Sequence, residues 1–163
     1  MRWLRLSHFF ILLVISLHCC TFIGHSDCNP EITSKLYDTI EKLIKDYNVT
    51  TFYVGTHGKF DYYSYTTLCE LEKIYKINIL VVISHLNNIP EYCNSKNTVF
   101  PEAVQKTPYK YAIIARNNYM IDKSEFIICY IEHTFSNTYK FVKTAIGKKL
   151  NIINLGQFDL NRI

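Results

Sequence analysis

Four histidines stand just after short apolar runs of the chain, and together they form its clearest chemical pattern. These residues are His25, His57, His85 and His133. If the runs are parallel strands, the loops that follow them meet at one edge of the sheet. Imidazole donates and accepts hydrogen bonds and titrates near neutral pH. Histidine is also common in loops by chance, but the set as a whole favours a site at this edge.

The spacing of the histidines does not favour a metal. No two of them are separated by three residues, the common spacing of ligands on one helix. His85 is expected far from His133, near an edge of the sheet. We therefore predict no metal and no cofactor. The chain also lacks the GxGxxG pattern of dinucleotide sites and the GxxxxGK[ST] pattern of P-loops.

Phosphate binding fits the neighbouring residues better. The run 136–138, Ser-Asn-Thr, follows an apolar strand and can open a helix whose free N–H groups face the same edge. Gly55 and Gly58 bracket a turn where backbone amides can approach a ligand closely. Arg116 can clamp a phosphate or a carboxylate. The alternative is that these are ordinary helix caps and that Arg116 pairs with Glu125 at the surface.

Cysteine chemistry is a further possibility. Cys28 near His25, or Cys129 beside the rim, could act as a nucleophile, and a helix start would lower the thiol pKa of Cys28. No third residue that would orient such a pair is evident, so the sequence does not favour cysteine catalysis.

The elements that would position these residues alternate along the chain. Apolar, β-rich runs lie at 20–23, 50–54, 77–83, 125–131 and 150–155, with a short strand-like piece at 98–100. Amphipathic runs between them predict helices at about 30–48, 60–75, 109–123 and 136–147, the last ended by Gly147 at its C′ position. Residues 84–108 otherwise suggest a loop. This βαβαβ-αβαβ order predicts an α/β fold, a single doubly wound, mostly parallel Rossmann-like sheet with helices on both faces.

Composition agrees with one folded domain. The 163 residues are 48% hydrophobic and 20% charged, with only 5 Gly and 4 Pro, which excludes a disordered or linker-like chain. The net charge is +4, but the lysines are scattered, so specific nucleic-acid binding is not expected.

The amino-terminal residues differ in composition from the rest of the chain. Arg2 and Arg5 precede an apolar run at 9–17, the outline of a signal peptide or anchor. We predict an apolar N-terminal extension at 1–18, a Rossmann-like domain at 19–157 and a tail at 158–163. A cytoplasmic location is expected, with membrane association or secretion through residues 1–18 as the alternative.

Several separated motifs resemble one family. They are the segments 21–28, 51–61, 115–120 with Ser124, and 152–155. Together they resemble the SLOG superfamily over about residues 20–156, in particular its YpsA-like uncharacterised bacterial branch, which is related to LOG and DprA proteins. The resemblance implies a Rossmann-like sheet that binds nucleotides or nucleotide-derived ligands, with no settled reaction.

The resemblance also implies site residues. By matching position these are Gly24 and His25 in the first loop, Gly55, His57, Gly58 and Asp61 in the second, and Arg116 with Asn117 in the Arg-containing motif. The chain departs from the family at two places. Ser136 and Asn137 stand where relatives have a glycine pair, and about Lys143 stands where LOG enzymes carry a catalytic Glu. Losing that carboxylate disfavours hydrolysis more than binding.

The function expected from the sequence is therefore a nucleotide-binding or sensing domain whose partner is a nucleotide-derived small molecule. Its expected ligand-binding residues are Gly24, His25, Gly55, His57, Gly58, Asp61, Arg116, Asn117, His133, Ser136, Asn137 and Thr138. The first alternative is a hydrolase of nucleotide N-glycosidic bonds, with Arg116 gripping phosphate and Asp61 as acid/base. The second is a protein-interaction module with a vestigial pocket. A homodimer through residues 60–63 is possible.

Overall fold

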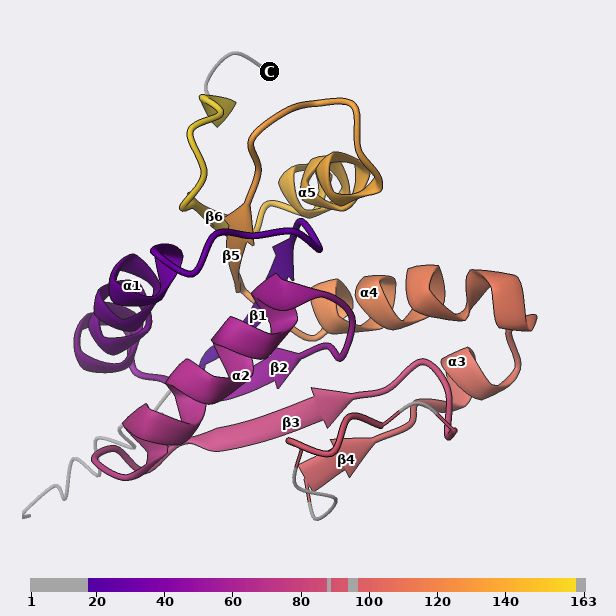
Figure 1. The fold of residues 1–163 in the computed structure, drawn as a ribbon, viewed down its shortest axis with the longest axis horizontal. Coiled ribbons are helices and arrows are strands. Elements are labelled where there is room, and N and C mark those ends of the chain that lie inside the picture. Colours follow the sequence, from indigo (N-terminus) through magenta and orange to yellow (C-terminus); the bar gives the residue numbers. More distant parts are fainter. Residues whose placement is uncertain (1–17, 88, 94–96, 161–163) are drawn as a thin grey trace, which may run out of the picture.

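The apolar runs of the sequence form one six-stranded sheet with the order β4-β3-β2-β1-β5-β6 (Figure 1). Every neighbouring pair of strands is parallel. The computed structural model describes residues 18–87, 89–93 and 97–160. The predicted doubly wound α/β fold is confirmed.

The elements follow one another in the predicted alternation. In chain order they are β1 (His18–Gly24), α1 (Ile32–Tyr47), β2 (Val49–Val54), α2 (Lys59–Glu72), β3 (Asn78–Val82), β4 (Thr98–Val99), α3 (Glu102–Gln105), the 3-10 helix η2 (Tyr109–Tyr111), α4 (Ala112–Asp122), β5 (Phe126–Tyr130), α5 (Asn137–Gly147) and β6 (Asn151–Asn154).

Two details of the prediction were wrong. The stretch predicted as a loop at 84–108 contains α3, a single turn after Pro101 that is too short to show a hydrophobic period. Gly147 is the last residue of α5 and not a left-handed residue beyond it. The backbone turns two residues later, at Lys149, which has a φ of 62°.

Helix α1 shows how the pattern becomes structure. Ile32, Leu36, Ile40 and Leu43 recur at helical spacing, and all four are buried against the sheet. Asn48 ends the helix in the left-handed conformation, with a φ of 52°, which asparagine tolerates better than most residues. The apolar period alone therefore fixes which face of α1 meets the sheet.

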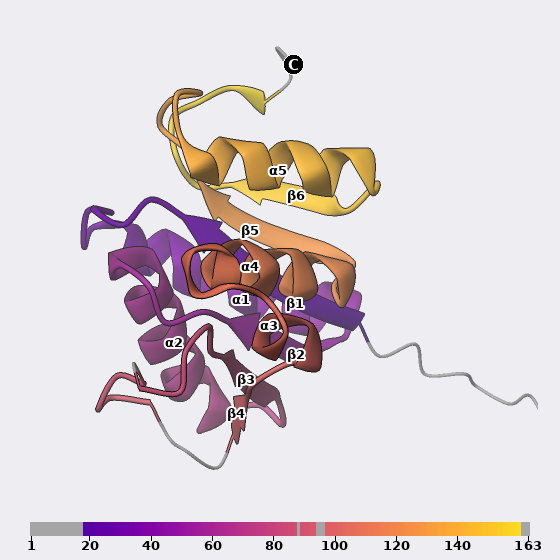
Figure 2. The ribbon, with the colours of Figure 1, turned by 90° about the vertical axis from the view of Figure 1, so that its right-hand side faces the viewer.

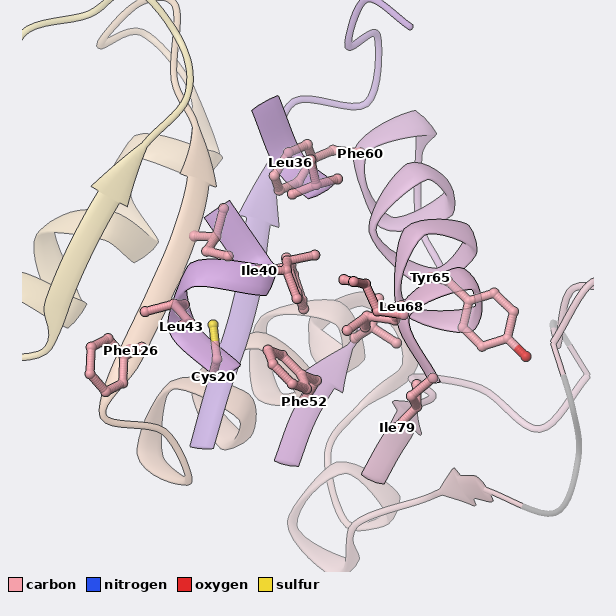
Figure 3. Packing of buried hydrophobic residues seen from close by; sticks show 14 of the residues in the cluster. Cys20, Leu36, Ile40, Leu43, Phe52, Phe60, Tyr65, Leu68, Ile79 and Phe126 are labelled. Atoms are coloured by element: carbon pink, nitrogen blue, oxygen red, sulfur yellow. The ribbon is translucent and has the colours of Figure 1, made fainter. Parts of the chain in front are cut away.

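The helices cover the sheet in two layers. Helices α1 and α2 lie on one face, while α4 and α5 lie on the other, which is turned toward the viewer in Figure 2. Figure 3 shows the core under α1 and α2, where Leu36, Phe52 and Phe60 are fully or almost fully buried. Strands covered on both faces read as continuous apolar runs, as β3 and β5 do.

The winding of the chain reverses at β1. From β1 the chain proceeds to β2 and β3 on one side, and it later returns to place β5 and β6 on the other. The loops after β1, β2 and β5 therefore end near one another at the carboxyl edge, where open α/β sheets bind ligands.

The predicted basic and apolar run before residue 18 lies outside the described residues, as do residues 161–163 of the predicted tail. Within the described ranges, no helix is both long enough and apolar enough to cross a membrane. The predicted domain boundaries stay predictions.

Candidate functional site

A cavity of about 450 Å³ opens at the carboxyl end of β1, between the loops after β1 and β2 and the helices α4 and α5. We call it the rim cavity. Its lining residues are Phe22, Ile23, Gly24, His25, Ser26, His57, Asp61, Lys110, Ile113, Ile114, Arg116, Asn117, Ser136, Asn137, Thr138 and Phe141. Nine of the twelve residues expected from the sequence are among them; Gly55, Gly58 and His133 are not.

A buried ion pair forms the floor of the rim cavity. Arg116 on α4 is 3% exposed and Asp61 on α2 is 5% exposed. Their closest atoms, Arg116 Nη2 and Asp61 Oδ2, are 3.6 Å apart. Asp61 Oδ2 also accepts a hydrogen bond of 2.8 Å from the backbone N–H of His57. The pair thus ties together three elements that meet only at this edge.

Asn117 holds the guanidinium in its orientation. Its side-chain oxygen accepts hydrogen bonds from Arg116 Nε at 3.0 Å and from Nη2 at 2.7 Å. Two neighbouring donors are thereby fixed on one acceptor. This leaves the remaining nitrogen, Nη1, as the donor group that the protein does not use.

Arg116 Nη1 is buried and has no hydrogen-bond partner. It is the one buried side-chain nitrogen or oxygen without a partner in the part of the chain that the structure describes. A buried unpaired donor costs about 1–3 kcal/mol, and more when the group is charged. Arg116 lines the rim cavity, and a phosphate or carboxylate oxygen is the kind of acceptor that would satisfy this donor.

Burial also sets the charge balance of the pair. It raises the pKa of Asp61, while Arg116 and the N–H of His57 oppose that shift. Burial likewise lowers the pKa of Arg116, and Asp61 opposes that shift. Each charge is therefore held in the cavity by the other, so an anion that enters meets a guanidinium already partly neutralised.

Gly55 makes room for this pair. An added Cβ at Gly55 would lie 2.4 Å from Asp61 Oδ2 and 2.8 Å from Arg116 Nη1. Gly55 therefore lies behind the ion pair, outside the cavity lining, and its role is to let the loop after β2 pass over it.

Gly58 acts in a similar way. It has a φ of 95°, and an added Cβ would lie 2.6 Å from the backbone Cα of Ser26. The next residue, Lys59, donates its N–H to Ser26 O at 2.9 Å. Gly58 thus brings the loop after β2 against the loop after β1.

The start of α5 forms another wall. Ser136 caps the helix, since its hydroxyl accepts a hydrogen bond of 3.1 Å from the N–H of Tyr139. Thr138 donates its hydroxyl to Gly24 O at 3.4 Å, which fastens this helix end to β1. The predicted capping run is confirmed. The first N–H groups of the helix and its positive dipole end lie beside the cavity.

His25 and His133 stack on each other at this rim. Their ring centroids are 4.6 Å apart, at an interplanar angle of 24°. His25 Nε2 accepts a hydrogen bond of 3.3 Å from the N–H of Glu132. Burial and the neighbouring His133 both lower the pKa of His25. His133 therefore supports a lining residue without lining the cavity itself.

The fourth histidine lies elsewhere. His85 follows β3 and contacts Ser84 and Tyr109, in a different cavity. Three of the four loop histidines therefore gather at the switch point, as the winding requires.

Several lining residues were not foreseen. Ser26 precedes the helical run, Lys110 lies in the short η2, and Ile113, Ile114 and Phe141 are apolar residues that read as core positions. Ile113 and Ile114 are neighbours on α4, and both line the rim cavity. Ile114 is 47% exposed.

Two alternatives from the sequence are contradicted. Arg116 is not a surface partner of Glu125, whose carboxylate instead accepts the N–H of Cys19 at 2.7 Å. Cys28 does not have a lowered pKa. Burial raises the pKa of Cys28 to about 11 and that of Cys129 to about 12, so both thiols stay protonated at neutral pH.

Lys143 stands at about the position where LOG enzymes carry a catalytic Glu. Lys143 is exposed on α5 and does not line the rim cavity, although its ammonium lies 6.0 Å from the ring of Tyr139.

Across the described ranges, no three His, Cys, Asp or Glu side chains gather as metal ligands would.

Comparison with known proteins shows a likeness of fold. No family model matches the chain. No curated protein matches it at a significant level. Among solved structures, it is similar to the X-ray structure of DNA processing protein A (DprA) from Streptococcus pneumoniae, with a TM-score of 0.62 and 13% sequence identity. The match covers 85% of this chain and 50% of that DprA chain, so the chain spans half the length of this neighbour. The chain therefore has a Rossmann-like fold of the kind found in DprA, one of the relatives that the sequence resemblance implied.

Proposed function

We propose that the rim cavity binds a small phosphorylated molecule derived from a nucleotide, and that the chain is a binding or sensing domain of the YpsA-like branch of the SLOG superfamily. The observation that carries the proposal is Arg116 Nη1, a buried cationic donor without a partner, on a residue that lines a cavity which also borders the start of α5. A phosphate oxygen would satisfy this donor while the helix N–H groups bind its other oxygens.

The shape and chemistry of the cavity support a nucleotide more than inorganic phosphate. About 450 Å³ exceeds what one phosphate fills and falls in the usual range for small-molecule sites. Ile113, Ile114 and Phe141 add apolar surface to the cavity lining. Such a surface suits the flat face of a base or the carbon face of a ribose.

The test is a thermal-shift screen of the full chain. AMP and ADP-ribose are the ligands, and adenosine is the control that lacks phosphate. We expect the phosphorylated compounds to raise the melting temperature and adenosine to raise it little. If no nucleotide or nucleotide-sugar shifts the melting temperature, the proposal fails and the result favours the protein-interaction alternative.

Hydrolysis of an N-glycosidic bond is the second candidate. It is supported by Asp61, a carboxyl residue that lines the cavity. Asp61→Asn would then abolish release of the base from AMP and leave binding nearly intact. Unchanged turnover in Asp61→Asn, or no turnover in the wild type, would reject this candidate.

The DNA-processing role in the name of the structural neighbour is not carried over. At 13% identity the likeness shows the fold alone. The scattered charge of the chain still predicts no specific nucleic-acid binding. The cytoplasmic location expected from the sequence stays a prediction.

The possible homodimer also stays a prediction, with a narrower contact surface. Phe60 and Asp61 are buried, so a dimer through residues 60–63 would rest on Tyr62, which is 41% exposed. Analytical ultracentrifugation of the wild type and Tyr62→Glu would test it.

A further inference from the structure

A second cavity of about 540 Å³ lies beyond β3, away from the rim cavity. We call it the edge cavity. Its lining residues are Ser84, His85, Leu86, Asn87, Phe100, Val104, Gln105, Thr107, Tyr109 and Ala112, and none of them lines the rim cavity. The two cavities therefore have separate linings.

The hydrogen bonds of His85 fix which of its ring nitrogens carries the proton. Its Nε2 lies 3.2 Å from the backbone oxygen of Tyr109, and its Nδ1 lies 3.0 Å from the hydroxyl of Ser84. A carbonyl oxygen can only accept, so Nε2 must carry the proton. In the neutral ring Nδ1 is then an acceptor, and Ser84 donates its hydroxyl proton to it.

The imidazole is also held in place. The rings of His85 and Tyr109 have centroids 3.9 Å apart, and Tyr109 supplies the carbonyl that orients Nε2. A hydroxyl, a base within hydrogen-bond reach and a third group that orients the base are the geometric signature of an activated serine nucleophile. Here a backbone carbonyl takes the orienting place that a carboxylate often holds.

The walls of the edge cavity indicate what it would accept. None of its lining residues is Lys, Arg, Asp or Glu, and Leu86, Phe100 and Val104 provide apolar wall. Gln105 and Thr107 use their side-chain donors on backbone oxygens of Phe100 and Ala103. The edge cavity therefore suits a small uncharged molecule and not a phosphorylated one.

From this arrangement we propose that Ser84 is a nucleophile, with His85 as its general base, and that the edge cavity takes a small neutral ester. Ser84 Oγ bonds to the carbonyl carbon as its proton passes to His85 Nδ1. The ester C–O bond then breaks, and the alcohol leaves with that proton. Water, activated by the same nitrogen, releases the acid from the acyl-serine and restores the hydroxyl.

The experiment treats the full chain with p-nitrophenyl acetate. It follows the early burst of p-nitrophenolate and locates the acetyl group by peptide mass spectrometry. We expect acetyl on the peptide that carries Ser84. Ser84→Ala should remove both the burst and the label, and His85→Gln should slow acylation by about 100-fold, the order of effect of a general base.

The matched control is Ser34→Ala, which removes the hydroxyl of an exposed serine on α1 and should react like the wild type. AMP should not protect Ser84, because the two cavities share no residue. If Ser84→Ala does not fold, Ser84→Thr keeps a hydroxyl and reports whether the label stays at position 84. Acetylation elsewhere in the wild type, or an undiminished rate in His85→Gln, overturns the proposal.

Discussion

At the scale of single residues, Arg116 explains most of the rim cavity. Asn117 occupies two of its side-chain nitrogens and Asp61 balances its charge, while Nη1 is left without a partner. The sequence could predict that Arg116 matters, but not that it is buried. Nothing in the local pattern around it names Asp61, which lies 55 positions earlier, as its partner.

The Arg116–Asp61 pair should behave as one unit in stability. Arg116→Met leaves a buried carboxylate without its counter-charge, and Asp61→Asn leaves a buried guanidinium. Each single change should lower the free energy of unfolding by about 3 kcal/mol. The double variant should lose clearly less than the sum, as urea unfolding of all four proteins would measure. Additive losses would mean that the two groups do not interact.

His25 should make stability depend on pH. Its folded-state pKa is lowered from 6.5 because it is buried and faces His133. Below about pH 6.5 the unfolded chain therefore binds a proton that the folded chain resists, and the free energy of unfolding falls as pH drops toward the folded-state pKa. The contribution is fully present above pH 6.5.

Urea unfolding at pH 7.5 and 5.5 would measure this effect. We expect His25→Gln to lose less stability over this interval than the wild type does. His18→Gln is the matched control, because His18 lies at the opposite end of β1 from His25. An equal loss in His25→Gln and the wild type would count against the inferred role.

At the scale of elements, the sequence predicts most of the fold and only part of the site. Long periodic segments such as α1 were predicted closely because burial of one face decides both pattern and structure. The turn α3 was missed because it is too short to show a period. The predicted helix at 109–123 begins as the 3-10 helix η2, and Lys110 within it was not predicted as a lining residue.

Two substitutions of Ser136, at the start of α5, can separate its role in helix capping from a role in ligand binding. Ser136→Ala should cost about 1 kcal/mol of stability, because the N–H of Tyr139 loses its acceptor. Ser136→Asp restores an acceptor but adds a negative charge where we place the phosphate. It should therefore fold like the wild type and bind AMP at least about tenfold more weakly.

Thermal melting and calorimetric titration measure the two quantities separately. Ser34→Asp adds the same charge in the first turn of α1 and should leave binding unchanged. Equal affinity of Ser136→Asp and the wild type for AMP would remove α5 from the phosphate site.

Gly156 and Gly147 should respond differently to substitution by alanine. An added Cβ at Gly156 would lie 2.2 Å from the backbone oxygen of Ile131, whereas one at Gly147 would meet nothing within 4 Å. Gly156→Ala should therefore destabilise by about 1–3 kcal/mol, since a backbone group cannot rotate away. Gly147→Ala, within α5, should be neutral or stabilising by up to about 1 kcal/mol. Guanidinium unfolding of both variants would measure these changes in stability. A larger loss in Gly147→Ala than in Gly156→Ala would contradict the account.

At the scale of the whole molecule, the reversal of winding at β1 is what assembles the site. It brings His25, His57 and the start of α5 to one cavity and leaves His85, after β3, in another. The histidine pattern predicted a site at the carboxyl ends of the strands, but not the depth of the cavity or the contacts within it. Those depend on side chains from α2 and α4 that meet only after the sheet has formed.

The central claim is that Arg116 receives a phosphate oxygen in the rim cavity. The most direct measurement is calorimetric titration of AMP into the full chain, Arg116→Gln and Lys76→Gln, which removes a positive charge at an exposed position before β3. We predict that Arg116→Gln binds AMP about 10–100-fold more weakly than the wild type, the worth of one charge-assisted hydrogen bond, and that Lys76→Gln binds normally. Equal affinity of Arg116→Gln and the wild type, or no binding of AMP by any of them, would contradict the account.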